Sequence, residues 1–252
     1  NRRLVDAIQS DIEILREGFA TLAPAVVPIE EVSLVRVFAD RKEYLDYVPD
    51  HMKWSGGVWM PAQQELVISP LDLDSPRESR ERLLGVVYHE AWHQYVYYAL
   101  NRQSLPVWFD EGHAALFEAA DVDRRRRNME IEANETWISQ MEEVVAVTPF
   151  DVRTVLKADP KKFYSQNRKY YYACSYGLVY FLRAASPSCF PNQHYERILQ
   201  ITYKGTVEGT SHDEIYNTIE KAVDLDALQK DFNWFWDSKS MRRKAERYDI
   251  LQ

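Results

Sequence analysis

The chain has 252 residues, carries a formal net charge of −8 and is 13% aromatic. This length allows one large domain or two lobes around a shared cleft. The acidic charge argues against a nucleic-acid-binding protein, which needs a basic surface to engage phosphate, and no apolar run reaches the ~18 residues of a membrane span. We therefore expect a globular protein without a nucleic-acid partner and without a membrane span.

Hydrophobic periodicity predicts the elements of the N-terminal half. Apolar residues between Leu4 and Leu22 recur at steps of three and four, as on one face of a helix, and Pro24 stops this helix. Asp40 and Glu43 form a capping box that opens a short helix. The expected elements are a helix over 4–22, a strand over 32–39, a helix over 40–48, and strands over 57–60 and 65–69.

A long helix is predicted next. Ser75, Pro76 and Glu78 provide an N-cap, a proline at the first helical position and a capping-box glutamate. No proline or turn cluster interrupts the chain after this start, so we expect one helix over 76–100. A loop that contains a proline then separates it from a further helix over 109–122.

The C-terminal half is expected to be helical. The predicted segments are 137–145, 168–185, 193–203, 212–223 and 225–236. The basic run from Arg124 to Arg127 has acidic neighbours on both sides and is interpreted as a solvated helix end, with a nucleic-acid or polyanion patch as the alternative. Cys174 and Cys189 could pair in an oxidising compartment or remain buried thiols. The sequence thus predicts an α+β protein with a mixed front half and a helical back half.

The string His89-Glu90-Ala91-Trp92-His93 lies in the middle of the predicted long helix. A spacing of four residues puts both imidazoles on one helical face, one turn apart, where they can bind one zinc ion at about 2.0–2.1 Å. The carboxylate of Glu90 then lies beside the ion, where a base can take a proton from a water bound to it. These residues predict a catalytic metal site.

Zinc in a catalytic site needs a third protein ligand and an open fourth position. The metzincin pattern requires a histidine six residues after the motif and is excluded, because Ala99 stands there. His113 and Glu111 remain as candidate ligands. Glu118, seven residues after Glu111, could accept a hydrogen bond from the far nitrogen of a ligand histidine, and Asp110 is an alternative for this contact. For each of the two residues, a plain surface carboxylate is the other interpretation.

A second pattern follows the first in the chain, namely Trp108-Phe109-Asp110-Glu111-Gly112-His113-Ala114. It resembles the Trp-x-x-Glu-Gly-x-Ala pattern on the second helix of the gluzincins, which supplies a glutamate ligand. Together the two patterns make the chain similar, over roughly 32–182, to the peptidase-MA-like family of gluzincins, relatives of thermolysin and the zinc aminopeptidases. This resemblance implies one Zn²⁺ per chain, held by His89, His93 and Glu111.

The resemblance also implies a fold and further site residues. The fold is a zincin-like front lobe over 1–127, with a small mixed sheet and the HExxH helix, followed by an all-helical lobe over 128–252 that completes the active-site cleft. The further site residues are Gly56, Gly57, Val58 and Tyr172.

The three residues from Gly56 to Val58 resemble the edge strand that lines the substrate cleft in this clan. Glycines there let a peptide backbone approach and add as an extra strand, whereas a tight turn without a ligand role is the alternative. Tyr172 matches the tyrosine that donates a hydrogen bond to the oxyanion in the aminopeptidase branch, and a packing role is the alternative.

The implied activity is hydrolysis of peptide bonds in a peptide or protein substrate, at an extracytoplasmic (secreted or periplasmic) location. Met60 is followed by Pro61 and Ala62, so the acidic motif of the aminopeptidases is absent. His194 and His212 are loose candidates for the second oxyanion ligand of thermolysin and are more typical of helix starts. The alternatives are a zinc amidase acting on a non-protein substrate, such as a cell-wall peptide, and a zincin-fold binding protein without turnover.

Overall fold

The computed structural model describes residues 2–32, 34–70 and 76–251. It has a mixed α+β fold in which helices predominate and the C-terminal part is helix-rich. The predicted α+β class is therefore confirmed. Within the described ranges, every helix falls short of the length and apolarity that crossing a bilayer requires.

The contacts between residues divide the chain into two units. The first unit comprises residues 1–102 and 117–130, and the second comprises residues 103–116 and 131–252. The division predicted at residue 127 differs from this grouping in two segments: residues 103–116 group with the C-terminal helices, and residues 128–130 group with the first unit.

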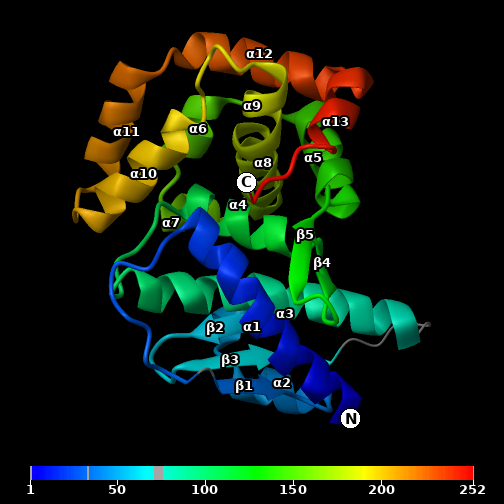
Figure 1. The fold of residues 1–252 in the computed structure, drawn as a ribbon. Coiled ribbons are helices and arrows are strands. Elements are labelled where there is room, and N and C mark those ends of the chain that lie inside the picture. The colour runs from blue at the N-terminus through cyan, green and yellow to red at the C-terminus, as the bar shows by residue number, and fades with distance from the viewer. Residues whose placement is uncertain (1, 33, 71–75, 252) are drawn as a thin grey trace. The chain divides into compact units, whose positions relative to one another are not determined.

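The first unit contains a small mixed sheet of β1 (Leu34–Val37), β2 (Gly57–Met60) and β3 (Glu65–Ile68), in the order β1-β3-β2. The central strand β3 pairs in parallel with β1 and antiparallel with β2. Strands β2 and β3 are buried along their whole length, whereas β1 is partly exposed and shorter than the predicted 32–39. As a result, β2 forms one edge of the sheet (Figure 1).

The helices of the first unit match the predicted segments closely. They are α1 (Arg2–Leu22), α2 (Arg41–Tyr47) and α3 (Pro76–Ala99), with a short 3-10 helix, η1 (Asp50–Met52), after α2. The side chain of Asp40 accepts the N–H of Glu43 at the start of α2, as the capping pattern predicted. The predicted N-cap of α3, Ser75, lies outside the described residues. Helix α3 packs against β2, β3 and α1 (Figure 1).

A hairpin of β4 (Ala120–Asp123) and β5 (Asn128–Ile131) replaces the helix end that was predicted there. The predicted helix over 109–122 is wrong beyond Phe117, where the helix ends, and the chain directly beyond Asn128 is a strand. The basic run is the hairpin turn rather than a helix end. The carboxylate of Asp123 accepts the N–H groups of Arg125 and Arg126 at 2.9 and 3.1 Å, and Arg127 has φ +51°.

Within the first unit, the hairpin is linked to α1 and α3 through a fully buried carboxylate, Asp11 of α1. Arg124 donates from Nε to its Oδ1 at 2.6 Å, and Tyr88 of α3 donates its hydroxyl to Oδ2 at 2.7 Å. A buried carboxylate without its cation typically costs about 3–5 kcal/mol. This arrangement therefore helps to hold α1, α3 and the hairpin together. Its α3 member, Tyr88, directly precedes His89 in the chain.

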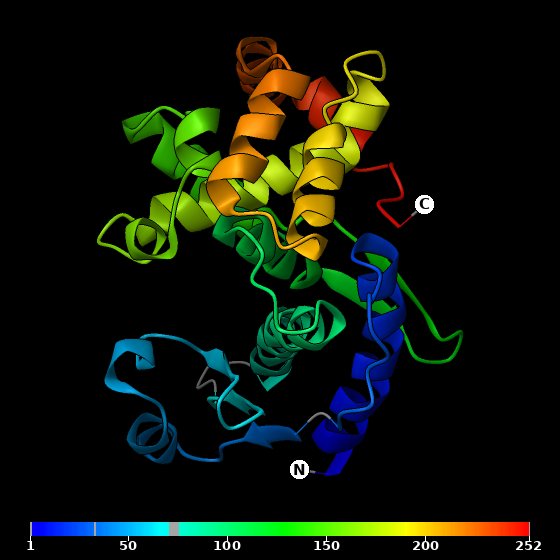
Figure 2. The same cartoon turned by 90° about the vertical axis from the view of Figure 1, so that its left-hand side faces the viewer.

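The second unit is built from helices. They are α4 (Val107–Phe117, whose last residue belongs to the first unit), α5 (Glu135–Val147), α6 (Val152–Leu156), α7 (Pro160–Phe163), α8 (Arg168–Tyr180), the π-helix η2 (Phe181–Ala185), α9 (Ser186–Cys189), α10 (Arg197–Val207), α11 (His212–Ala222), α12 (Leu225–Asp237) and α13 (Lys239–Ala245). Helix α5 packs on α8, and α10 lies beside α11 (Figure 2).

Two predicted helices of this unit differ from the structure. The segment 168–185 is α-helical only to Tyr180 and continues as a π-helix, a feature that hydrophobic spacing does not distinguish. The segment predicted over 193–203 begins at Arg197, because His194 has φ +53°, which is incompatible with a right-handed helix. Both Cys174 and Cys189 are free thiols.

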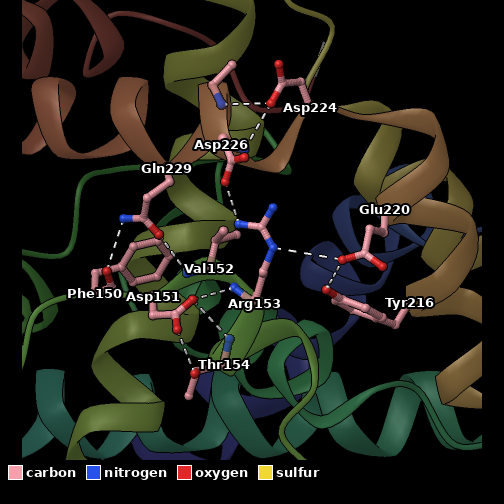
Figure 3. A network of polar contacts seen from close by, with 11 residues as sticks. Phe150, Asp151, Val152, Arg153, Thr154, Tyr216, Glu220, Asp224, Asp226 and Gln229 are labelled. Carbon is pink, nitrogen blue, oxygen red and sulfur yellow. Dashed lines mark hydrogen bonds and ion pairs between the residues drawn. The ribbon is translucent and has the colours of Figure 1, made fainter.

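The short helix α6 is fixed to α11 and α12 by a polar network (Figure 3). Arg153 donates to Asp226 at 2.8 Å and lies 3.9 Å from Glu220, while the side-chain oxygen of Gln229 accepts the N–H of Val152 at 2.8 Å. Exposed ion pairs of this kind contribute about 0–1 kcal/mol each. The buried stack of Phe150 on Phe232 in the same region, with ring centroids 3.8 Å apart, contributes through apolar burial as well.

Candidate functional site

The first unit carries the two histidines of the HExxH string on one face of α3. The Nε2 atoms of His89 and His93 are 3.2 Å apart. Nδ1 of His89 lies 2.7 Å from Oε1 of Glu118. When Glu118 accepts the Nδ1–H, the lone pair of His89 is on Nε2 and faces the second imidazole.

This spacing fits a shared metal ion. Two nitrogen ligands at about 2.0–2.1 Å from a tetrahedral zinc ion stand roughly 3.3 Å apart. The Nε2 atoms of His89 and His93 are separated by nearly this distance. The contact with Glu118 that the sequence suggested is present, and it orients His89 in the way that carboxylates orient metal-ligating histidines.

Glu118 is held in place by the residue before it. Phe117 stacks on Trp92 of α3, with ring centroids 5.4 Å apart, and meets Phe19 of α1 edge to face at 4.5 Å. All three rings are almost completely buried. Phe117 is thus anchored in the core of the first unit, one residue from the carboxylate that contacts His89.

Glu90 is buried, with 8% of its surface exposed, and its side chain reaches the sheet. Its Oε2 accepts the backbone N–H of Trp59 in β2 at 2.7 Å. Gly57 explains how the strand comes so close, because a Cβ atom there would lie 2.7 Å from Val86 and 3.1 Å from the Cγ of Glu90. The candidate base and the edge strand are therefore in direct contact.

The pairing of β2 decides which backbone groups point to its free edge. The carbonyl of Gly56 accepts the N–H of Ser69, so residues 56, 58 and 60 turn their hydrogen-bonding groups toward β3. Gly57 and Trp59 turn theirs outward. Of the predicted substrate contacts Gly56, Gly57 and Val58, only Gly57 presents backbone groups at the edge, and the N–H of Trp59 is held by Glu90.

In the second unit, Glu111 lies on α4 with 4% of its surface exposed. Two phenols donate to the same oxygen of this carboxylate, Oε1. The hydroxyl of Tyr164 lies 2.6 Å from it and the hydroxyl of Tyr172 lies 3.1 Å from it. The structure therefore brings Glu111 and Tyr172, both expected site residues, into contact.

Gly112 accounts for the closeness of α4 and α8. A Cβ atom at this position would lie 2.5 Å from the side chain of Val179 and 2.6 Å from the carbonyl oxygen of Ser175. Only a glycine allows the two helices to touch at this point. This packing explains why a glycine follows Glu111 and how the carboxylate reaches Tyr172 on α8.

Tyr164 is a site residue that the sequence did not reveal. It follows α7, which Asp159 caps and Pro160 opens, so the start of this helix could have been predicted from that pair. No local pattern indicates that the hydroxyl of Tyr164 contacts Glu111, because the two residues are 53 positions apart.

His113, the other candidate ligand, is engaged elsewhere. It is fully buried, its Nδ1 donates to the carbonyl of Phe109 at 2.7 Å, and its Nε2 accepts from Nη2 of Arg183 at 3.0 Å. Burial, and then the cation of Arg183, lower the pKa of His113 well below its usual range. Burial likewise lowers the pKa of Arg183 to about 10. A neutral imidazole with both nitrogens in hydrogen bonds stabilises α4 rather than holding a metal.

In the part of the chain that the structure describes, His194, His212 and Cys174 belong to no group of three or more potential metal ligands. Among the described contacts of His194, its Nδ1 lies 3.4 Å from the carboxylate of Glu196. His212 begins α11 and donates to the carbonyl of Ser104 at 3.1 Å. Both histidines are exposed. Burial raises the pKa of Cys174 to about 12, so this thiol stays protonated and unreactive.

Comparison with known proteins gives one match. A family model described as a protein of unknown function (DUF1570) matches residues 84–193. This span contains the part of α3 from residue 84 onward and the whole of α4 and α8, and with them the HExxH string, Glu111, Glu118, Tyr164 and Tyr172. No curated protein and no solved structure matches the chain.

Proposed function

We propose that the chain is a zinc-dependent hydrolase of peptide bonds in which His89, His93 and Glu111 hold the ion. The observation that carries the proposal is the 3.2 Å separation of the two Nε2 atoms, with Glu118 on the far nitrogen of His89. Among the described residues, these three side chains form a group suited to hold a metal.

The donor set favours a catalytic ion over a structural one. Structural zinc sites close all four positions and usually use cysteine, whereas two histidines and one carboxylate leave a position open. Glu111 is proposed as the third ligand because the Trp-x-x-Glu-Gly-x-Ala pattern over residues 108–114 resembles the gluzincin helix that supplies a glutamate ligand.

In the proposed hydrolysis, the metal ion would supply Lewis acidity, and protein side chains would supply proton transfer and a hydrogen bond to the substrate. Zinc, when bound, supplies Lewis acidity that polarises a carbonyl and lowers the pKa of a coordinated water to about 7. Glu90 takes the proton from the attacking water and later gives it to the leaving amine. The hydroxyl of Tyr172 donates a hydrogen bond to the oxygen of the scissile carbonyl as negative charge develops on it.

The edge strand favours a peptide as substrate. Gly57 turns its backbone N–H and C=O groups away from β3, at the edge of β2, and an extended peptide can pair with an edge strand. Glu90 contacts the same strand at Trp59. A peptide that adds to β2 would therefore lie next to the base.

Removal of the metal tests this function. The protein is dialysed against a chelator, reconstituted with zinc, and assayed on fluorogenic peptide libraries and in parallel on peptidoglycan fragments. We expect peptide cleavage that disappears in the chelated protein and returns with about one equivalent of zinc. Cleavage of the peptidoglycan fragments alone would establish the amidase alternative. Zinc binding without any cleavage would establish the alternative of a binding protein without turnover.

A further inference from the structure

Glu111 receives an unusual pair of donors. A carboxylate oxygen has two lone-pair sites, and the hydroxyls of Tyr164 and Tyr172 both donate to Oε1. The contact of Tyr164 is the shorter one, 2.6 Å against 3.1 Å. Short hydrogen bonds to an ionised acceptor are the stronger ones. The two phenols are therefore not equivalent partners of the carboxylate.

Tyr164 is held in this position by its surroundings. It directly follows α7, and the preceding Phe163 is completely buried in an apolar cluster with Val107 and Tyr171. The ring of Tyr164 meets that of Phe163 edge to face, with centroids 5.2 Å apart. The residue itself is 47% exposed, yet its hydroxyl reaches a carboxylate that is 4% exposed.

We propose that Tyr164 is a positioning residue that keeps Oε1 of Glu111 and directs Oε2 to the metal. This inference rests on the proposed function and gives the two phenols different roles: Tyr164 orients the ligand Glu111, and Tyr172 donates to the substrate. Because Tyr164 keeps the carboxylate oriented, Tyr172 can leave its longer hydrogen bond and turn to the substrate oxygen without loss of the ligand's geometry. With one phenol only, the same hydroxyl would have to donate both to the carboxylate of Glu111 and to the substrate oxygen.

The test compares Tyr164→Phe, Tyr172→Phe and the matched control Tyr170→Phe. The hydroxyl of Tyr170 donates to the carbonyl of Pro149 and not to Glu111. The zinc affinity of each metal-free protein is measured by competition with a chromophoric chelator, and kcat is measured at saturating zinc. Phenylalanine preserves the ring of each tyrosine, so the aromatic packing is retained.

We expect Tyr164→Phe to weaken zinc binding by about 10- to 100-fold, the usual effect of losing a group that orients a metal ligand. Tyr172→Phe should change zinc affinity less and kcat more, and Tyr170→Phe should change neither. Wild-type zinc affinity in Tyr164→Phe, or an equal loss in the control, overturns the proposal.

The affinity comparison needs no substrate. If the wild type binds zinc but cleaves no peptide, the proposed function fails and the affinities still decide the role of Tyr164. If the wild type binds no zinc, both proposals are overturned.

Discussion

Glu90→Gln is expected to bind zinc as the wild type does and to lose roughly 10²- to 10⁴-fold in kcat, the usual contribution of a general base. The amide has the shape of the carboxylate, and its oxygen can still accept the N–H of Trp59 that Glu90 accepts at 2.7 Å. It cannot take up a proton from water. The effect should therefore fall on turnover, with little change in folding or in metal content.

Steady-state kinetics on a cleaved peptide, with zinc content measured on the same samples, checks this expectation. Glu81→Gln, an exposed position earlier on α3, is the matched control and should keep both values. Full turnover in Glu90→Gln with zinc bound would show that another group serves as the base.

Gly112→Ala is expected to lower both stability and zinc affinity. The added methyl group would lie 2.5 Å from Val179 and 2.6 Å from the carbonyl oxygen of Ser175, so α4 and α8 must separate. Such overpacking typically costs about 1–3 kcal/mol. Because Glu111 is the preceding residue, the same displacement should pull the carboxylate away from Tyr172 and from the metal.

Urea unfolding and a zinc competition titration measure the two effects. Gly56→Ala is a suitable control for stability, since the nearest atom to its added methyl group would be at an ordinary 3.5 Å. Wild-type stability and zinc affinity in Gly112→Ala would show that the spacing of α4 and α8 does not position the ligand.

Local patterns in the sequence predicted much of the first unit. The spacing of apolar residues located α1, and the cap at Asp40 located α2. The start signal at Pro76 and Glu78, followed by a run without proline or turn residues, located α3. The four-residue spacing of His89 and His93 predicted that the two imidazoles share a face, and their Nε2 atoms are in contact. In each case, residues close in the chain determine the feature.

The features that were missed depend on distant residues. The hairpin at 120–131 has short strands and a charged turn that resemble a helix end in composition, and its partner Asp11 is 113 positions from Arg124. The contact of Tyr164 with Glu111 likewise spans 53 positions. The backbone groups of Gly57 point to the edge of the sheet, whereas those of Gly56 point to β3. This difference follows from the pairing with β3 and cannot be predicted from the two glycines alone.

Elemental analysis of protein purified without added metal tests the central claim, a His-His-Glu zinc site, most directly. The wild type, Glu111→Ala and the control Glu143→Ala, an exposed glutamate of α5, are compared. We expect about one zinc per chain in the wild type and the control, and a large loss in Glu111→Ala. Full zinc content in Glu111→Ala would contradict the assigned ligand set, and no zinc in the wild type even after zinc is supplied would contradict the metal site itself.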